Sequence, residues 1–200
     1  MRTGLPAVYH YKVVAVKYDV ILADPPWKFN YYSDNKKNIR HITNKYPIME
    51  TSDICNLPIG DLAAKNSVLF IWAVWPNLFE SEKVINAWGF TFKTLAWVWV
   101  KAKPSGFGFF TGMGFYTRAN TEPCLLAVKG SMPVAAHDIQ ALIYDPVREH
   151  SRKPDDQYRK IEALYPDRQY LELFARRPRK GWQVWGNEVI SDIQIGEVLS

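Results

Sequence analysis

The run Asp24-Pro25-Pro26-Trp27 gathers a carboxylate, two carbonyls and a flat indole ring at one corner of the chain. Proline fixes φ and has no backbone N–H, so the two prolines make this corner rigid and add no donor of their own. The oxygens accept hydrogen bonds, and the indole offers a face for stacking. We therefore predict that the corner holds an amino group on a planar ring, although Asp and Pro also form ordinary turns.

A buried strand is expected to place this corner. Residues 18–23 include the apolar run Val20, Ile21 and Leu22, which is typical of a strand covered on both faces. Asp24 then stands where the strand ends. Ligands of open α/β sheets bind at the carboxyl ends of the strands, so Asp24 is expected at a binding site.

The rest of the chain alternates between strand and helix patterns, which predicts a doubly wound α/β sheet with three layers. Strands are expected at residues 7–16, 18–23, 67–72, 90–101, 122–128, 170–174 and 182–185, and helices at 53–65, 77–88 and 153–164. Pro58 is expected to bend or split the first helix. Residues 145–152 are expected to be a polar connection.

Two long loops interrupt this pattern. Residues 28–46 are polar and basic, and Lys36, Lys37 and Arg40 are either phosphate contacts or solvated charges. We expect this loop to be mobile without substrate and to become ordered on nucleic acid. Residues 102–121 interleave four glycines with five aromatic residues. This second loop is either a hairpin packed on itself or a set of stacking faces.

Composition limits the class of protein. The chain has 200 residues, 48% of them hydrophobic, and a net charge of +5, which fits one globular domain (residues 1–200, core about 18–189) and favours a polyanionic partner. Cys55 and Cys124 are far apart, which favours a reducing, cytoplasmic location. We expect no membrane span, no metal site, and a monomer or homodimer.

The corner and several later segments resemble the MT-A70 family, the DPPW class of S-adenosylmethionine-dependent adenine-N6 methyltransferases. The matching segments follow one another in the family's order: residues 24–27, 67–72, 97–101, 122–130, 148–155, 172–176 and 186–188. Ala175 stands where the family usually has glycine, and Glu188 where it often has glutamine. The resemblance implies a Rossmann-like class I methyltransferase fold in permuted order, with the catalytic corner first and the cofactor-binding strand late.

The resemblance also implies roles for individual residues. Asp24 and the Pro25 carbonyl would accept the two N–H groups of the target amine, while Pro26 and Trp27 complete the catalytic corner. Lys153 would pair with the carboxylate of S-adenosylmethionine, its alternative being a solvated helix start. The other implied cofactor contacts are Asp24, Glu172, Phe174, Arg176, Asn187 and Glu188, with Glu172 and Arg176 facing ribose or each other. The implied substrate contacts are Glu122, which faces Lys153 or the base, and Arg148.

Together these features predict an enzyme that methylates the N6 amine of adenine in nucleic acid, with DNA preferred. Three alternatives stay open at this point: an RNA adenosine-N6 methyltransferase, a cytosine-N4 methyltransferase, and a non-catalytic nucleic-acid-binding subunit. An intact Asp24-Pro25-Pro26-Trp27 run argues against the last, because such a subunit has no need of the acid.

Overall fold

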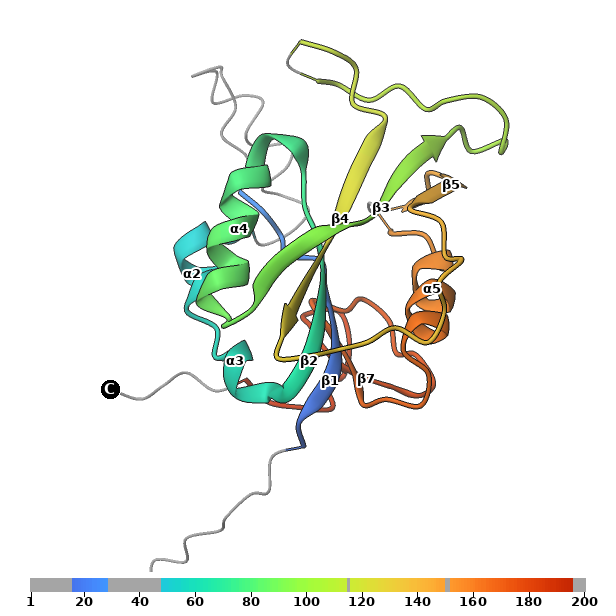
Figure 1. Cartoon of the computed structure of the whole chain (residues 1–200). Helices are drawn as coiled ribbons and strands as arrows, with labels where there is room; N and C mark the ends of the chain where they lie inside the picture. Colours follow the sequence, from blue (N-terminus) through green and yellow to red (C-terminus); the bar gives the residue numbers. More distant parts are fainter. Residues whose placement is uncertain (1–15, 29–47, 115, 150–151, 196–200) are drawn as a thin grey trace, which may run out of the picture.

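A single seven-stranded sheet organises the fold (Figure 1). The computed structural model describes residues 16–28, 48–114, 116–149 and 152–195. The sheet order is β5-β3-β4-β2-β1-β6-β7, and β4 runs antiparallel to the other six strands. The strands are β1 (Tyr18–Ala23), β2 (Ala63–Trp72), β3 (Thr91–Ala102), β4 (Thr121–Lys129), β5 (Leu142–Pro146), β6 (Tyr170–Leu173) and β7 (Trp182–Trp185).

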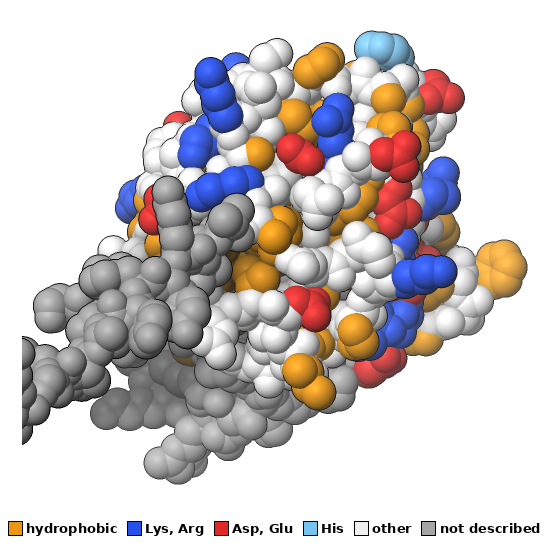
Figure 2. Space-filling view, turned by 90° about the horizontal axis from the view of Figure 1, so that it is seen from below, with side chains coloured by type: hydrophobic (Ala, Val, Ile, Leu, Met, Phe, Trp, Pro, Cys, Tyr) orange, Lys and Arg blue, Asp and Glu red, His pale blue; other side chains and the backbone are white. Residues whose placement is uncertain are grey.

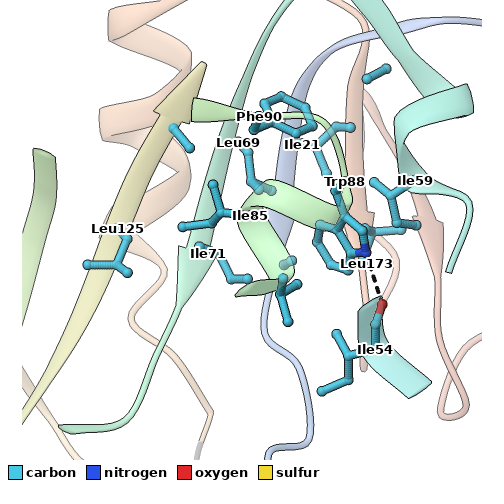
Figure 3. Packing of buried hydrophobic residues seen from close by; sticks show 14 of the residues in the cluster. Ile21, Ile54, Ile59, Leu69, Ile71, Ile85, Trp88, Phe90, Leu125 and Leu173 are labelled. Atoms are coloured by element: carbon cyan, nitrogen blue, oxygen red, sulfur yellow. Dashed lines mark hydrogen bonds between the residues drawn. The ribbon is translucent and has the colours of Figure 1, made fainter. Parts of the chain in front are cut away.

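Helices cover both faces of this sheet. α2 (Thr51–Cys55), α3 (Ile59–Leu62) and α4 (Leu78–Ala87) contribute to one core cluster, and α5 (Asp156–Leu164) contributes to a second. Side chains of β1 and β2 alternate between these clusters, so both strands are apolar on both faces. Figure 3 shows the first cluster, where the Trp88 indole also donates to the Ile54 carbonyl at 2.9 Å. The predicted three-layer α/β fold is confirmed.

Most of the predicted elements are present, with shifted ends. The helix expected at residues 53–65 is two short helices separated at Pro58, as a residue without an N–H allows. Its predicted last turn is wrong, because β2 already begins at Ala63. The short helix η1 (Trp75–Asn77) precedes α4. Gly89, which has a φ of 78°, follows the C-terminal end of α4. The strand expected at residues 7–16 lies outside the described residues, apart from Val16, which is not in a strand.

The polar connection predicted at residues 145–152 needs correction. Its first two residues end β5, which pairs in parallel with β3 along the register Val98↔Leu142 to Ala102↔Pro146. This strand is hard to detect because it is short and lies at the edge of the sheet, with Leu142 and Tyr144 exposed.

The two ends of the sheet carry different groups of side chains. Figure 2 views the molecule from the side where β1 begins, and basic, acidic and hydrophobic side chains are intermingled there. At the other end, Ala23 at the end of β1 is level with Ile71 in β2 and Leu173 in β6. The residues that follow these three therefore meet at one edge. None of the helices in the described ranges is long and apolar enough to cross a membrane.

Candidate active site

The corner after β1 is held by backbone hydrogen bonds. Asp24 directly follows Ala23, so its side chain projects at the carboxyl edge of the sheet. The Pro25 carbonyl accepts the N–H of Trp27 at 2.8 Å, and the Pro26 carbonyl accepts the N–H of Met49 at 2.9 Å. A carbonyl oxygen has two lone pairs, so each carbonyl can still accept a second hydrogen bond. The corner is therefore rigid while its oxygens keep accepting capacity.

Trp27 has a different place from the one predicted. Its side chain packs in the core cluster beside α4, and only 5% of the residue is exposed. Its indole N–H donates to the carbonyl of Trp72 at 2.9 Å, which ties the corner to the end of β2. In this conformation Trp27 offers no open face, so stacking on a target base would require the ring to leave the core.

Lys153 joins two carboxylates beside the corner. Its Nζ lies 2.9 Å from both oxygens of Asp24 and 3.3 Å from Oε2 of Glu122, and Glu122 also pairs with Lys101. Side-chain exposure is only 11% for Lys153 and 14% for Glu122. Four elements thus bring together a chain of alternating charges, which we call the charge chain: Asp24, Lys153, Glu122 and Lys101. Glu122 was expected to face Lys153 or the target base, and in the structure it faces Lys153.

Burial and the neighbouring charges shift the pKa values of Lys153 and Glu122 in opposite directions. Burial alone would lower the pKa of Lys153, but the attraction of Asp24 and Glu122 raises that pKa above its ordinary value. Burial alone would raise the pKa of Glu122, but Lys153 and Lys101 hold it below its ordinary value. Lys153 and Glu122 are therefore both charged at neutral pH, and each is compensated by its neighbours.

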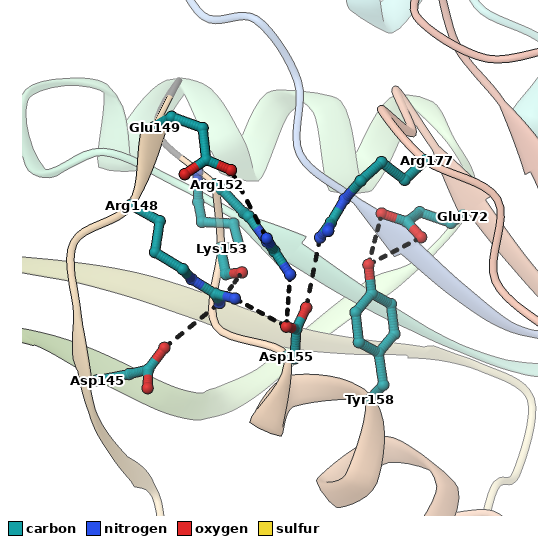
Figure 4. Close-up of polar contacts among 9 residues, drawn as sticks. All are labelled: Asp145, Arg148, Glu149, Arg152, Lys153, Asp155, Tyr158, Glu172 and Arg177. Atoms are coloured by element: carbon teal, nitrogen blue, oxygen red, sulfur yellow. Dashed lines mark hydrogen bonds and ion pairs between the residues drawn. The ribbon is translucent and has the colours of Figure 1, made fainter.

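Glu172 on β6 faces the same cleft, and its partner is Tyr158 (Figure 4). The Tyr158 hydroxyl lies 3.0 Å from each Glu172 carboxylate oxygen. Burial raises the pKa of Glu172 to about 7; the Tyr158 hydrogen bond opposes this rise, and the Asp24 charge adds to it. The Trp182 ring packs edge-on against the Tyr158 ring, with 5.4 Å between the ring centroids. The guanidinium of Arg179 lies 4.2 Å from the centroid of the Tyr158 ring.

The cleft extends from Asp24 to the segment after β6. Its lining consists of Leu22, Asp24, Trp72, Arg152, Lys153, Gln157, Tyr158, Glu172, Phe174, Arg176 and Arg177. Tyr158 and Gln157 are absent from the sequence-based site. A signal for Tyr158 was available, because a glutamate inside a buried strand requires a polar partner. Gln157 is buried and accepts the Trp72 indole N–H at 2.7 Å.

The segment after β6 turns sharply, which allows it to pass close to the end of β7. Phe174 has φ of 60°, and its ring packs edge-on against Trp185 at 5.4 Å. The Ala175 N–H donates to the Trp185 carbonyl at 2.9 Å. A Cβ on Gly186 would lie 2.1 Å from the Ala175 oxygen, so Gly186 permits this close approach. Ala175 itself has no left-handed φ, so alanine fits where the family usually has glycine.

The remaining predicted site residues differ in whether they line the cleft, lie on an exposed turn or support a neighbouring segment. Arg176 faces Glu188 at 3.8 Å, and Asn187 and Glu188 lie on an exposed turn beyond β7. Arg148 donates to Asp155 at 2.7 Å and to the Lys153 carbonyl at 3.0 Å, so it braces the segment that carries Lys153. Asp155 also pairs with Arg152 and Arg177, as Figure 4 shows.

Lys36, Lys37 and Arg40 lie outside the described residues. In the ranges that the structure covers, no group of three His, Cys, Asp or Glu is placed to hold a metal ion.

Comparison with known proteins shows which family the chain resembles over most of its length. Residues 18–188 match the MT-A70 family. The chain is 32% identical over 189 residues to the type II methyltransferase M.MunI of Mycoplasma sp, covering 86% of this chain and 78% of that protein. It is 30% identical over 188 residues to the human N(6)-adenine-specific methyltransferase METTL4 and 29% identical over 176 residues to a putative N(6)-adenosine-methyltransferase MT-A70-like of Medicago truncatula. These two matches cover 86% of this chain but only 38% and 26% of the relatives.

Proposed function

The chain belongs to the MT-A70 family of adenine-N6 methyltransferases, and on this premise we propose that it transfers a methyl group from S-adenosylmethionine to the N6 amine of adenine in DNA. One observation carries the proposal. A carboxylate followed by two prolines stands at the carboxyl end of central strand β1 and opens into a cleft that contains Glu172 and Lys153.

The chemistry required of the corner follows from the target amine. The lone pair of an adenine amine is delocalised into the ring, so the nitrogen must be aimed and its developing positive charge stabilised. Asp24 would accept one N–H of this amine, and the free lone pair of the Pro25 carbonyl would accept the other. Fixed acceptors of this kind stabilise charge without reorganising during the reaction. Lys153 would have to share Asp24 with the substrate, because it contacts both carboxylate oxygens.

The cleft fits the chemical groups of S-adenosylmethionine, which supplies an electrophilic methyl group on a sulfonium when bound. Lys153 is the cation for its carboxylate, while Asp24 and Glu172 are anions for its ammonium group. Phe174 offers an apolar surface, and Arg176, Asn187 and Glu188 lie on the two segments that approach each other at Gly186. These assignments rest on the donor and acceptor types in the cleft.

DNA is proposed as the substrate because the matched type II methyltransferase is covered over 78% of its length. The chain spans only about a quarter to two fifths of the matched adenosine methyltransferase of Medicago truncatula and of human METTL4. The test therefore also measures the two alternative reactions, methylation of adenosine N6 in RNA and of cytosine N4.

The test is transfer of a labelled methyl group to DNA and RNA, followed by mass spectrometry of the nucleosides. We expect N6-methyladenine in DNA. Asp24→Asn and Asp24→Ala should lower the rate by about 10²–10³ or more, as removal of a preorganised electrostatic partner does. Asp138→Asn, which changes an exposed aspartate that does not line the cleft, is the control. Turnover of the Asp24 variants within tenfold of the unmodified chain would show that Asp24 does not bind the amine.

A further inference from the structure

The connection between β3 and β4 directs large apolar side chains into solvent. Phe107 is 84% exposed and Tyr116 97% exposed, and Phe109 and Met113 are exposed as well. Single exposed hydrophobic residues are common on protein surfaces, but four on one connection are unusual. Of these four, Phe109 packs edge-on against the Tyr144 ring of β5 at 6.0 Å. We call residues 103–114 and 116–120 the aromatic hairpin; these described residues present side chains that the core does not use.

Backbone hydrogen bonds shape this hairpin in place of a packed core. The Lys103 N–H donates to the Gly108 carbonyl at 3.0 Å, and the Gly112 N–H donates to the Ala119 carbonyl at 3.0 Å. Gly108 has φ of 74°, and a Cβ on Gly112 would lie 2.5 Å from the Ala119 oxygen. Glycine therefore permits the turns and the close approach of the backbone, while Phe107 and Met113 between the glycines face solvent.

The aromatic hairpin is anchored directly on the charge chain. It leaves the sheet after Ala102 at the end of β3 and returns at Thr121 at the start of β4. The neighbours of these two residues, Lys101 and Glu122, pair with each other. The Lys101 N–H donates to the Asn120 carbonyl at 2.8 Å, which closes the base of the hairpin. Figure 1 shows the connection extending beyond the carboxyl end of β3. A molecule that contacts the hairpin therefore lies at the edge of the sheet where Asp24 projects.

Charge indicates what kind of partner the hairpin fits. Residues 103–120 contain Lys103 and Arg118 and neither Asp nor Glu. Cations combined with exposed aromatic rings are what proteins use to bind unpaired nucleotides, whose bases offer free faces for stacking. The bases of a duplex are already stacked on one another. The exposed rings thus match a single-stranded or locally opened nucleic acid better than an intact duplex.

We propose that the aromatic hairpin binds unpaired nucleotides next to the target adenine, with Phe107 and Tyr116 stacking on bases and Lys103 and Arg118 contacting phosphates. This proposal rests on the proposed function and deepens it, because it names the state of the nucleic acid that the active site receives. The hairpin contributes affinity for nucleic acid and leaves the cofactor cleft untouched.

The test compares binding of a fluorescent single-stranded DNA oligonucleotide containing adenine by the full chain and by the double variant Phe107→Ala/Tyr116→Ala. We expect the dissociation constant to rise roughly tenfold or more, since each base–aromatic stack is worth about 1–3 kcal/mol. The affinity for S-adenosylhomocysteine and the melting temperature should not change, because both side chains are exposed. Phe107→Tyr/Tyr116→Phe, which keeps both rings, should bind like the unmodified chain, as should Phe92→Ala, an exposed phenylalanine near the start of β3.

Two results would overturn the proposal. One is unchanged DNA affinity in the double variant while the unmodified chain binds and methylates DNA. The other is a change of oligomeric state with unchanged DNA affinity, which would make the hairpin a contact between copies of the chain. Failure of the unmodified chain to bind or methylate any nucleic acid would instead refute the proposed function, and the hairpin proposal with it.

Discussion

Replacing Glu172 by glutamine tests the electrostatics of the cleft most directly. Glu172 is largely buried, and its carboxylate oxygens both lie 3.0 Å from the Tyr158 hydroxyl. A glutamine of the same shape keeps an oxygen that accepts this hydrogen bond, but it cannot ionise. The substitution therefore removes one buried charge and leaves the packing unchanged.

The size and sign of the effect follow from the pKa of Glu172. Folding raises this pKa from 4.5 to about 7, because burial disfavours the charged form. Between these two pH values the folded chain holds a proton that the unfolded chain has released, so stability falls as pH rises. The penalty is absent below pH 4.5 and reaches about 3 kcal/mol above pH 7. Glu172→Gln escapes it, so the variant should match the unmodified chain at low pH and exceed its stability by up to about 3 kcal/mol at pH 8.

Urea unfolding at pH 5, 6, 7 and 8, followed by tryptophan fluorescence, measures this difference. Titrations of all other groups are shared by the two proteins and cancel in the comparison. Glu82→Gln, an exposed glutamate on α4, is the control and should show no pH-dependent difference. A difference between Glu172→Gln and the unmodified chain that stays constant from pH 5 to 8 would refute the reasoning, as would a variant that is less stable at pH 8.

Two further perturbations address the remaining charges. Lys153→Met takes the shared cation from the buried Glu122 and the half-buried Asp24, so the unfolding free energy should fall, by at most roughly 3–5 kcal/mol because Glu122 keeps Lys101. Calorimetry should also show weaker S-adenosylhomocysteine binding by roughly 1.5–3 kcal/mol, with Lys93→Met on the exposed part of β3 as control; unchanged values would remove Lys153 from the cofactor site. Neutralising Lys36, Lys37 and Arg40 together should weaken DNA binding and flatten its salt dependence by about one slope unit per lost phosphate contact. An unaltered slope in isotherms at several salt concentrations would rule out phosphate contact by these three residues.

The sequence was sufficient to predict the centre of the fold. The run Val20-Ile21-Leu22 is buried on both faces because β1 is an inner strand whose side chains alternate between the two core clusters, and that burial is what made the strand recognisable. β5 was missed for the opposite reason. It pairs with one neighbour only, is half exposed, and contains the charged Asp145, so its sequence carries little of the apolar signal that marks a buried strand.

For the site, residue types were predictable but contacts were not. The sequence places Trp27 beside Asp24 but does not say on which side the ring packs, and the structure buries it beneath the end of β2. The partner of Glu172 depends on how α5 lies across β6, which brings Tyr158 to it from outside the strand. Such contacts are set by packing between elements, whereas local sequence patterns report on each element separately.

The charge chain changes how roles can be assigned at this edge of the sheet. The sequence suggested the target amine and a cofactor contact for Asp24, and the cofactor carboxylate for Lys153. In the structure the same Lys153 ammonium compensates Asp24 and Glu122, and Glu122 is compensated in turn by Lys101. Removing any member takes one of its charge partners from a neighbour, so a single substitution reports the cost to that neighbour as well as the lost contact. The effects of Asp24→Asn and Lys153→Met on cofactor affinity should therefore be measured together with the effect of the double variant. The difference between the effect of the double variant and the sum of the two single effects isolates the interaction between the two residues.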